Sequence, residues 1–412
     1  MADKWKTMQF SDAVQINPKS PVKKGEVYPF VDMKAIEPNN RSVTTLIERE
    51  FKGGGSKFID GDTLMARITP CLENGKIARY KSVHEETVAH GSTEFIVIRG
   101  KPDITDSLFV YYLTRWDEVR NYAISQMSGT SGRQRVPNES LDHLEISIPP
   151  ITEQKAIAHV LGTLDDKIEL NRRMNETLES ITQAIFKSWF VDFDPVRAKA
   201  EGRDTGLPKE IAALFPDSFE ESELGEIPKG WEVVNLSNVI KIFDSKRVPL
   251  SARERLKRQG TYPYYGATSI MDYIDDYLFD GTYILVAEDG SVVDKNDNPV
   301  VQYVWGKFWV NNHAHILKGT NGISNEHLML FLKQVYIHPY ITGAVQLKLN
   351  QGNLNRIPFI KPQRDLCDMF SKTLDSLFSK YKNNIEMNLN LEIQRDGLLP
   401  KLLTGEIRLN HS

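Results

Sequence analysis

The sequence contains very little cysteine and no long apolar run. Only two of its 412 residues are cysteine, Cys71 and Cys367, which excludes a disulfide framework and indicates a reducing compartment. Nowhere are 18 consecutive residues apolar, so a membrane-spanning helix is not expected. The first ten residues also lack the apolar segment of a signal peptide. We therefore expect a cytoplasmic protein.

Positive charge is not in excess either, because the net charge is −4. Residues 151–230 carry ten basic and sixteen acidic side chains, whereas residues 1–150 carry twenty of each. Residues 231–363 carry fourteen basic and twelve acidic side chains. The chain therefore lacks the overall basic character of many nucleic-acid-binding domains, but the segments on either side of the acidic block can still carry local basic faces.

Signatures of catalysis are missing as well. The sequence has no Gly-x4-Gly-Lys-Ser/Thr phosphate loop, no Asp/Asn-Pro-Pro-aromatic motif of amino methylation, and no acidic pair followed by Glu-x-Lys as in nucleases. His313 and His315 are two residues apart, on one face of an expected strand, but no cysteine or second histidine pair lies near them. We expect no catalytic residue, no metal site and no cofactor on this chain, which favours a binding protein.

What the chain does contain is an internal repeat. KWKTMQFSDAVQI near the start matches GWEVVNLSNVIKI from Gly230, FIDGDTLMAR matches LFDGTYILVA, and VPNESLDHLEISIPP matches LNQGNLNRIPFIKP. The last pair is offset by 213 residues, and that offset continues into the segment that follows. Identity between the copies is low, so the conserved order of the matches carries the argument. We infer two copies of one unit.

Each copy is predicted to be a β-rich head followed by a long helix. Short apolar runs such as EFIVIRG and YILVAE are bounded by Gly, Asp and Asn, which is typical of strands. From Thr152, apolar residues recur at spacings of three, four and seven as far as Ile185, and a second such stretch runs from Phe370 to Leu398. The expected fold class is α+β, with two β-rich globular heads joined by two long helices.

The narrow apolar stripes with charged flanks favour pairing of the two helices as an antiparallel coiled coil, with ordinary core packing as the alternative. Asn171 and Asn384 occupy matching positions, where polar residues can define the register. An antiparallel pair would return the C-terminus to the first head, in a pseudo-twofold and nearly circular arrangement completed by the tail LLTGEIRL. The residues expected in the helix-pairing seam are Leu161, Leu164, Ile168, Asn171, Leu374, Leu377, Tyr381 and Asn384.

The repeat and the helical stretches predict five segments. The first head is expected at residues 1–150, the first helix at 151–190, a linker at 191–228, the second head at 229–363, and the second helix with the tail at 364–412. The linker contains four prolines and most of the acidic excess. It is therefore expected to be a solvated connector with one short helix at residues 208–214.

Three stretches place hydrogen-bond donors that suit DNA on expected loops. ARITPCLENGKIARYK predicts a hairpin with a basic rim. SGTSGRQRV and its counterpart TGAVQLKLNQGN predict matching polar loops, and SKRVPLSARERLKRQG is strongly basic. A solvated hairpin and a charged solvent-facing helix are the alternatives for the first and third. The candidate DNA-binding residues are Arg67, Asn74, Lys76, Arg79, Lys81, Arg133, Gln134, Arg135, Lys246, Arg247, Arg253, Lys348 and Asn350.

Several of these motifs together resemble the specificity subunit of type I restriction–modification systems. The first half carries GDTLMARITPCLENGK, GSTEFIVIR, SGTSGRQRV, IPPITEQKAIA and SWFVDFDPVRAK, and the second half carries YPYYGATSI and KLLTGEIRL. The resemblance covers essentially the whole chain, in order. It implies a non-catalytic subunit in which each head is a target recognition domain that reads one half of an asymmetric bipartite DNA site, with the helices as a spacer.

The resemblance also implies partners besides double-stranded DNA. Two methyltransferase (modification) subunits would dock on the helices and heads and carry S-adenosylmethionine, and restriction/translocase subunits would use ATP and magnesium. From the residues alone, two other functions remain open. The chain could be a coiled-coil scaffold or anti-restriction decoy without its own sequence specificity, or a self-contained enzyme with an unrecognised site.

Overall fold

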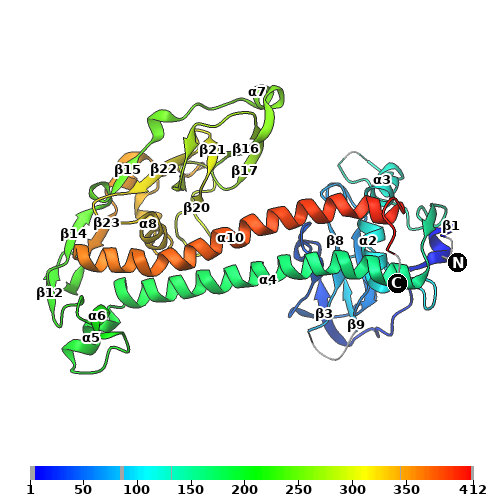
Figure 1. The fold of residues 1–412 in the computed structure, drawn as a ribbon, viewed down its shortest axis with the longest axis horizontal. Coiled ribbons are helices and arrows are strands. Elements are labelled where there is room, and N and C mark those ends of the chain that lie inside the picture. The colour runs from blue at the N-terminus through cyan, green and yellow to red at the C-terminus, as the bar shows by residue number, and fades with distance from the viewer. Residues whose placement is uncertain (1–4, 84–87, 131, 344, 410–412) are drawn as a thin grey trace. The chain divides into compact units, whose positions relative to one another are not determined.

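The computed structural model describes residues 5–83, 88–130, 132–343 and 345–409. Contacts divide the chain into two units. Unit 1 combines Met1–Arg173 with Asn384–Ser412, and unit 2 is Met174–Asn383. Each unit holds one β-rich head and part of each of two long helices, as the labels of Figure 1 show. The division therefore falls within the helices, whereas the sequence treated heads and helices as separate segments.

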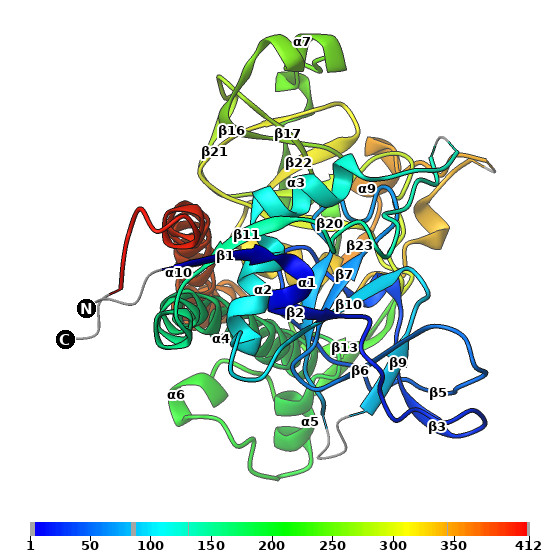
Figure 2. The ribbon, with the colours of Figure 1, turned by 90° about the vertical axis from the view of Figure 1, so that its right-hand side faces the viewer.

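The head of unit 1 is built from three sheets. A five-stranded sheet has the order β2 (Val14–Ile16), β10 (Phe95–Gly100), β7 (Thr63–Ala66), β8 (Ile77–Tyr80) and β4 (Ser42–Val43). A four-stranded sheet has the order β5 (Glu48–Glu50), β3 (Val27–Val31), β9 (Val88–Gly91) and β6 (Ser56–Ile59). The third sheet pairs β1 (Lys6–Gln9) with β11 (Glu145–Ile148), as Figure 2 shows.

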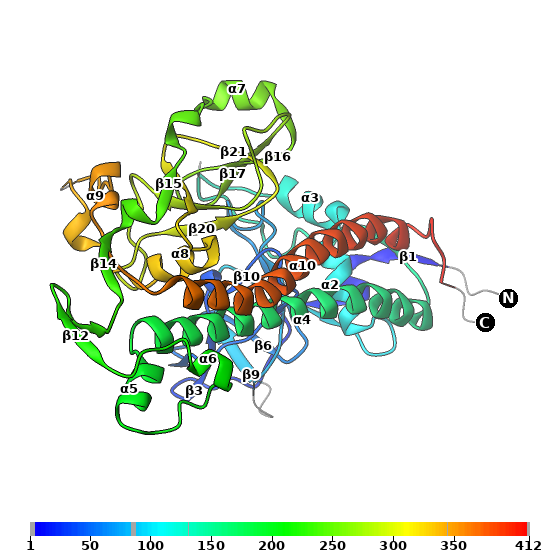
Figure 3. The same ribbon diagram turned by 60° about the vertical axis from the view of Figure 1, so that its left-hand side comes forward.

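The head of unit 2 has the same kinds of sheet (Figure 3). One sheet has the order β15 (Ile240–Ile242), β22 (Ala314–Gly319), β19 (Tyr283–Ala287) and β20 (Val301–Val304). Another has the order β17 (Ile270–Ile274), β16 (Gln259–Tyr265), β21 (Lys307–Val310) and β18 (Phe279–Asp280). The third pairs β14 (Glu232–Asn235) with β23 (Pro358–Lys361).

The two heads share one connectivity, which confirms the duplication. In unit 1, β3 pairs antiparallel with β5 and parallel with β9, which pairs antiparallel with β6. In unit 2, β16 pairs antiparallel with β17 and parallel with β21, which pairs antiparallel with β18. The central strands β7 and β19 are buried along their whole length, so they read as continuous apolar runs rather than as alternating patterns. The equivalent strands then align Ile16 with Ile242, as the sequence repeat predicted.

Shorter helices complete the two units. In unit 1, α2 (Ser107–Arg115) packs on β10 and β7, and Asp106 caps its N-terminus. In unit 2, α8 (Asn325–Leu332) packs on β22 and β19, and Ser324 caps it. The remaining short elements are α1 (Phe10–Ala13), η1 (Met33–Ala35), α3 (Asp117–Ser125), α5 (Asp194–Ala200), α6 (Lys209–Ala212), η2 (Leu236–Asn238), η3 (Asp244–Lys246), α7 (Ala252–Lys257), η4 (His338–Tyr340) and α9 (Gln351–Asn355). A further two-stranded sheet pairs β12 (Phe219–Ser222) with β13 (Gly225–Pro228).

Two helices of 40 residues, α4 (Ile151–Phe190) and α10 (Arg364–Leu403), dominate the chain. At 1.5 Å per residue, each is about 60 Å long. In unit 1, Asn171 contacts Asn388 and Asp165 contacts Arg395, so the two helices run antiparallel there. No helix in the described part of the chain combines the length and the apolarity needed to cross a bilayer.

In unit 2 the helices are antiparallel as well, because Phe186 packs against Phe370 and Asn175 donates a hydrogen bond to the carbonyl of Tyr381. Antiparallel pairing is thus confirmed within each unit. The pseudo-twofold relation between the units stays a prediction.

The seam between the helices differs from the predicted apolar stripe. Ile181 and Met387, which fall within the two predicted apolar stretches, are 42% and 40% exposed. Polar side chains occupy the middle of the seam instead, where Nδ2 of Asn171 donates to Oδ1 of Asn388 at 2.8 Å. Other members of the stripe, such as Leu161 and Leu374, are buried toward the ends of the helices, where they meet the cores of the heads.

The predicted pairing residues divide according to this pattern. Leu161 lies in the core of unit 1 with Leu399, and Leu374 lies in the core of unit 2 with Phe186. Asn171 and Asn384 are fully buried, and Ile168 is nearly so. Leu164, Leu377 and Tyr381 are half-buried.

A buried ion pair joins the two helices in unit 1. Arg395 Nη1 contacts Asp165 Oδ1 at 2.8 Å, and the two side chains are 2% and 4% exposed. The Tyr112 hydroxyl donates to the other oxygen of Asp165 at 2.6 Å. Burial and the neighbouring Asp165 carboxylate raise the pKa of Tyr112, which therefore stays protonated as a donor.

The linker is part of the fold of unit 2, which corrects the prediction of a solvated connector. Phe193, Phe215 and Ile227 are buried in the core of unit 2 with Trp231. Residues 191–228 form two short helices and the β12–β13 hairpin, rather than one helix at 208–214. These core residues could not be recognised from the sequence, because many acidic residues stand between them.

The C-terminal tail completes unit 1. Glu153 at the start of α4 accepts two hydrogen bonds from Arg408, at 2.7 and 2.8 Å, and one from the indole of Trp5 at 3.2 Å. Ile407 packs against the core of unit 1, as Ile227 does in unit 2, and each follows the sequence Gly-Glu. Tail and N-terminal strand therefore meet, as the repeat predicted.

We predict that Arg395→Ala lowers the free energy of unfolding of unit 1 by about 3–5 kcal/mol, because the Asp165 carboxylate stays buried without its cation. Arg173→Ala is the matched control, since Arg173 forms an exposed ion pair with Glu169 on α4. It should cost less than about 1 kcal/mol. Hydrogen exchange of the α4 amides in unit 1 measures both, and equal losses would contradict a stabilising role for the buried pair.

Candidate DNA interface

Two loops occupy equivalent places in the two heads. Loop 1 is residues 128–135 of unit 1, and loop 2 is residues 342–348 of unit 2. The base of loop 1 is closed by reciprocal backbone hydrogen bonds between Ser128 and Arg135, at 3.0 and 2.9 Å. The base of loop 2 is closed in the same way between Thr342 and Lys348, at 2.8 and 2.7 Å. The structure thus brings together the two polar loops that the repeat aligned.

The backbone that supports the loops is also the same in both heads. In unit 1, the amide of Val136 donates to the carbonyl of Arg67, and the amide of Arg67 donates to the carbonyl of Glu94, at 2.8 and 2.9 Å. In unit 2, Leu349 donates to Glu288 and Glu288 donates to His313 at the same two distances. Equivalent positions are therefore Arg67 and Glu288, Glu94 and His313, and Arg135 and Lys348.

The side chains on this shared backbone differ. Arg135 forms a bidentate ion pair with Glu94, with nitrogen–oxygen distances of 2.8 to 3.0 Å. At the equivalent places Lys348 is exposed, and His313 pairs with Asp289 at 2.7 Å. One of the three positions, Arg67 and Glu288, has reversed charge between the heads, and a second has an imidazole in place of a carboxylate. The two heads therefore present different side chains on the same backbone arrangement.

Arg133 and Gln134 lie on loop 1. Arg133 is exposed, and its guanidinium makes no hydrogen bond or ion pair within the described residues. Gln134 is half-buried, and its backbone bonds to Thr69. Gly129 and Gly132 have φ of +127° and +79°, a region that favours glycine, so the turn depends on them. Arg133 is the loop residue best placed to donate to a ligand.

The first basic stretch does not form a single rim, which corrects the prediction. β7 and β8 do pair antiparallel, but ten residues connect them. Lys76 donates to the carbonyl of Met33 at 2.9 Å, and Arg79 donates to Ser107 at 3.3 Å. Asn74 is exposed in the turn. The positive charges point in different directions because the long connection folds back on itself.

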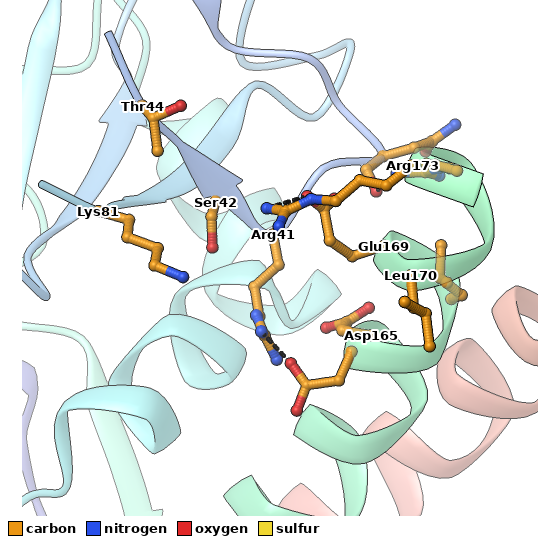
Figure 4. Close-up of a pocket in the computed structure, with 12 residues that line it drawn as sticks. Arg41, Ser42, Thr44, Lys81, Asp165, Glu169, Leu170 and Arg173 are labelled. Atoms are coloured by element: carbon orange, nitrogen blue, oxygen red, sulfur yellow. Dashed lines mark hydrogen bonds and ion pairs between the residues drawn. The ribbon is translucent and has the colours of Figure 1, made fainter. Parts of the chain in front are cut away.

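Lys81 lies at a hollow between the head and α4, within unit 1. The hollow has a volume of about 290 Å³. Figure 4 shows Arg41 and Lys81 of the head facing Asp165, Glu169 and Arg173 of α4. Arg41 forms an ion pair with Asp166, and Arg173 forms one with Glu169. Most charges around this hollow therefore compensate one another, and the ion pair between Arg41 and Asp166 holds the head against the helix.

The basic residues of the third stretch also differ in their surroundings. Arg253 is exposed on α7, whose N-terminus is closed by a capping box between Ser251 and Glu254. Lys246 is exposed and lies 5.6 Å from the ring of Phe243. Arg247 is only 15% exposed and pairs with Glu288 at 2.6 Å, so its guanidinium is already engaged within the head.

Arg247 belongs to a partly buried charge cluster with Asp244, Glu288 and His315. His315 lies 2.6 Å from Asp244 through Nδ1 and 2.7 Å from the carbonyl of Leu349 through Nε2. Burial alone would lower the pKa of His315, but its hydrogen bond to Asp244 and that charge raise it. Both partners of the ring are acceptors, so both ring nitrogens donate protons, and His315 joins Arg247 in balancing the two carboxylates.

Asn350 has a structural role in the same region. Its side chain accepts a hydrogen bond from the amide of Asn353 at 2.8 Å and caps α9. The sequence repeat predicted the loop but not this cap, because asparagine is favoured both at a helix N-terminus and in contacts with DNA.

One basic residue was missed by sequence reasoning. Lys19 is exposed beside the base of loop 1, in a hollow that it shares with Arg67 and Asn138. In the sequence it is a single lysine after Pro18, so no local pattern marks it. Only the pairing of β2 with β10 brings it to Arg67.

Comparisons with known proteins agree with this arrangement. The family described as the type I restriction modification DNA specificity domain matches residues 2–180 and again residues 228–395. The specificity subunit of the type I restriction enzyme HindI of Haemophilus influenzae is 29% identical, over 87% of this chain and 89% of that protein. The specificity subunit of MjaIX of Methanocaldococcus jannaschii is 27% identical, over 74% of this chain and 69% of that protein.

A solved structure supports the fold. The S subunit of a type I restriction–modification system from M. genitalium has a TM-score of 0.52 and 16% identity, and the match covers 99% of this chain and 97% of that one. The family match spans both copies of the head and most of both long helices. The chain therefore belongs to the family of type I restriction–modification DNA specificity subunits, the non-catalytic components that recognise the DNA sequence.

Proposed function

We propose that each head of this chain reads one half of an asymmetric bipartite DNA site, loop 1 for one half and loop 2 for the other. The observation that carries this is the shared backbone support with different side chains. Arg67, Glu94 and Arg135 in unit 1 stand where unit 2 has Glu288, His313 and Lys348. Because base pairs differ in the donors and acceptors that they present, unlike side chains on one scaffold suit unlike half-sites.

We propose further that α4 and α10 bind the methyltransferase subunits. In unit 1 their surface exposes large apolar side chains, with Leu170 at 53%, Leu389 at 54% and Ile393 at 71%. Leu389 and Ile393 are four residues apart, so they share one face of α10. Such a face gains stability when a partner covers it. The chemistry would then reside on partner subunits that hold S-adenosylmethionine, with ATP and magnesium on the restriction/translocase subunits.

The continuous helices suggest how two half-sites are held at a set distance. Each helix begins in one unit and ends in the other without a break. A paired helix is stiff, so its length would act as a spacer. A scaffold or decoy without sequence specificity is disfavoured by the family match, and a self-contained enzyme by the non-catalytic nature of the family.

We predict that replacing residues 1–150 by the first head of another specificity subunit changes one half-site only. The second head keeps its own core, so its recognition should persist. Methylation sequencing of a host that carries the variant with its modification subunits measures both half-sites. Recognition that changes at both halves, or at neither, would contradict separate reading by the heads.

We predict that adding seven residues to each long helix, at matching positions, widens the spacer and leaves both half-site sequences unchanged. Seven residues add about 10 Å, or roughly three base pairs. The same methylation sequencing reads the new spacing. An unaltered spacer in a folded, active variant would exclude the helices as the measuring element.

We predict that Arg133→Ala reduces discrimination at the half-site of the first head by about 1–3 kcal/mol, because an exposed guanidinium is lost from loop 1. Binding to duplexes with single base changes measures the loss. The second half-site is the internal control and should be read as before. Unchanged affinity and methylation would remove Arg133 from the interface.

A further inference from the structure

A second hollow lies on the head of unit 1, beside loop 1. It has a volume of about 390 Å³. Arg67 in its wall is joined to loop 1, because its carbonyl accepts the amide of Val136. Asn138, two residues beyond Val136, also lines it. A ligand in this hollow would therefore touch the support of the loop.

The hollow is positively charged. Lys19, Lys57 and Arg67 line it, and none of its described lining residues is acidic. Lys19 makes no ion pair within the described residues, and the Lys57 ammonium lies 4.9 Å from the ring of Phe51. Without carboxylates, these cations leave a net positive charge that suits an anion.

Hydrogen-bond donors are also available. Arg67 Nη1 donates to Asn138 Oδ1 at 2.7 Å, which holds the guanidinium in place. Its Nε is buried and has no hydrogen-bond partner in the described part of the chain. The side chain of Ser56 adds a hydroxyl at the wall, although it donates to the carbonyl of Ser92. A guanidinium held in place next to an ammonium without an ion pair, and without carboxylates in the lining, is well suited to a phosphate group.

The equivalent place in unit 2 carries different side chains. The registers of the equivalent strands show that Arg67 in unit 1 corresponds to Glu288 in unit 2, and that Pro18 corresponds to Asp244. Lys57 corresponds to Leu278, which packs against the core of its head. Two cations, Arg247 and His315, balance the two carboxylates of the partly buried cluster there. The basic hollow is thus a property of the first head.

We propose that the basic hollow of the first head binds a phosphate of the DNA backbone beside the half-site that loop 1 reads. The inference rests on the proposed function. It adds that the two heads contact the DNA backbone through different residues. A phosphate contact fixes the position of the head on the duplex, and the bases are left to the loop.

The first test measures how the affinity of the assembled complex for its DNA site depends on salt. Lys19→Gln removes an exposed charge, so the fold is retained, and Lys19→Gln with Arg67→Gln removes two. Loss of this one phosphate contact in the double variant should lower the slope of log affinity against log salt by about one, and Lys19→Gln alone should lower it by part of that amount. The double variant should then bind about tenfold more weakly than the unaltered protein at low salt.

The control is Lys209→Gln, because Lys209 is an exposed lysine of α6 in unit 2 and suffers the same loss of charge. Its slope should equal that of the unaltered protein. A lower slope in this control equal to that of Lys19→Gln would show a general charge effect and would overturn the proposal.

The second test locates the phosphate. Single phosphates around the first half-site are replaced by neutral methylphosphonates, one duplex at a time. The unaltered complex should lose severalfold affinity at one position, and the double variant should lose less than twofold there. If both proteins respond alike at every position, the hollow holds no phosphate.

These outcomes separate the inference from the proposed function. If the unaltered complex shows no sequence preference, reading by the heads is wrong and the phosphate site falls with it. If the preference is intact but the slopes and the methylphosphonate responses are unchanged, only the phosphate site is wrong. A variant that relaxes base preference instead of weakening all sequences equally would make Lys19 and Arg67 base contacts.

Discussion

Antiparallel pairing of α4 with α10 is the constraint on which the other features depend. In unit 1 it is maintained by the buried Asp165–Arg395 ion pair and the Asn171–Asn388 hydrogen bond. Buried polar pairs tolerate little displacement, because any shift leaves a charge or an amide without a partner. The pairing therefore defines the register of the helices, and it brings the tail back to Glu153 and Trp5. Without it, unit 1 would lose part of its core.

The heads show how one backbone can serve two recognition tasks. The amide and carbonyl groups around loops 1 and 2 make the same hydrogen bonds in both units. These bonds involve no side chain, so the residues at Arg67, Glu94 and Arg135 can differ from those at Glu288, His313 and Lys348 without loss of the support. A duplicated domain can in this way diverge in specificity and keep its fold.

Charge is used differently in the two heads. In unit 2, opposite charges compensate one another in the cluster of Asp244, Glu288, Arg247 and His315, and His315 also fastens Leu349 at the end of loop 2. In unit 1, the corresponding place is open and basic. A chain with a net charge of −4 can thus still present a local surface for DNA, because the acidic excess is confined to residues 151–230.

The sequence by itself determined the duplication, the β-rich heads, the long helices and the two matching loops, because periodicity and the order of motifs are local properties. It could not place the polar seam or the core residues of the linker, such as Phe193 and Phe215. Nor could it tell paired cations from free ones. Arg135 and Arg247 are each neutralised by a glutamate 41 residues away, whereas Arg133 and Lys19 are not. Only the tertiary structure decides this, since a charge is compensated by whatever the fold brings beside it.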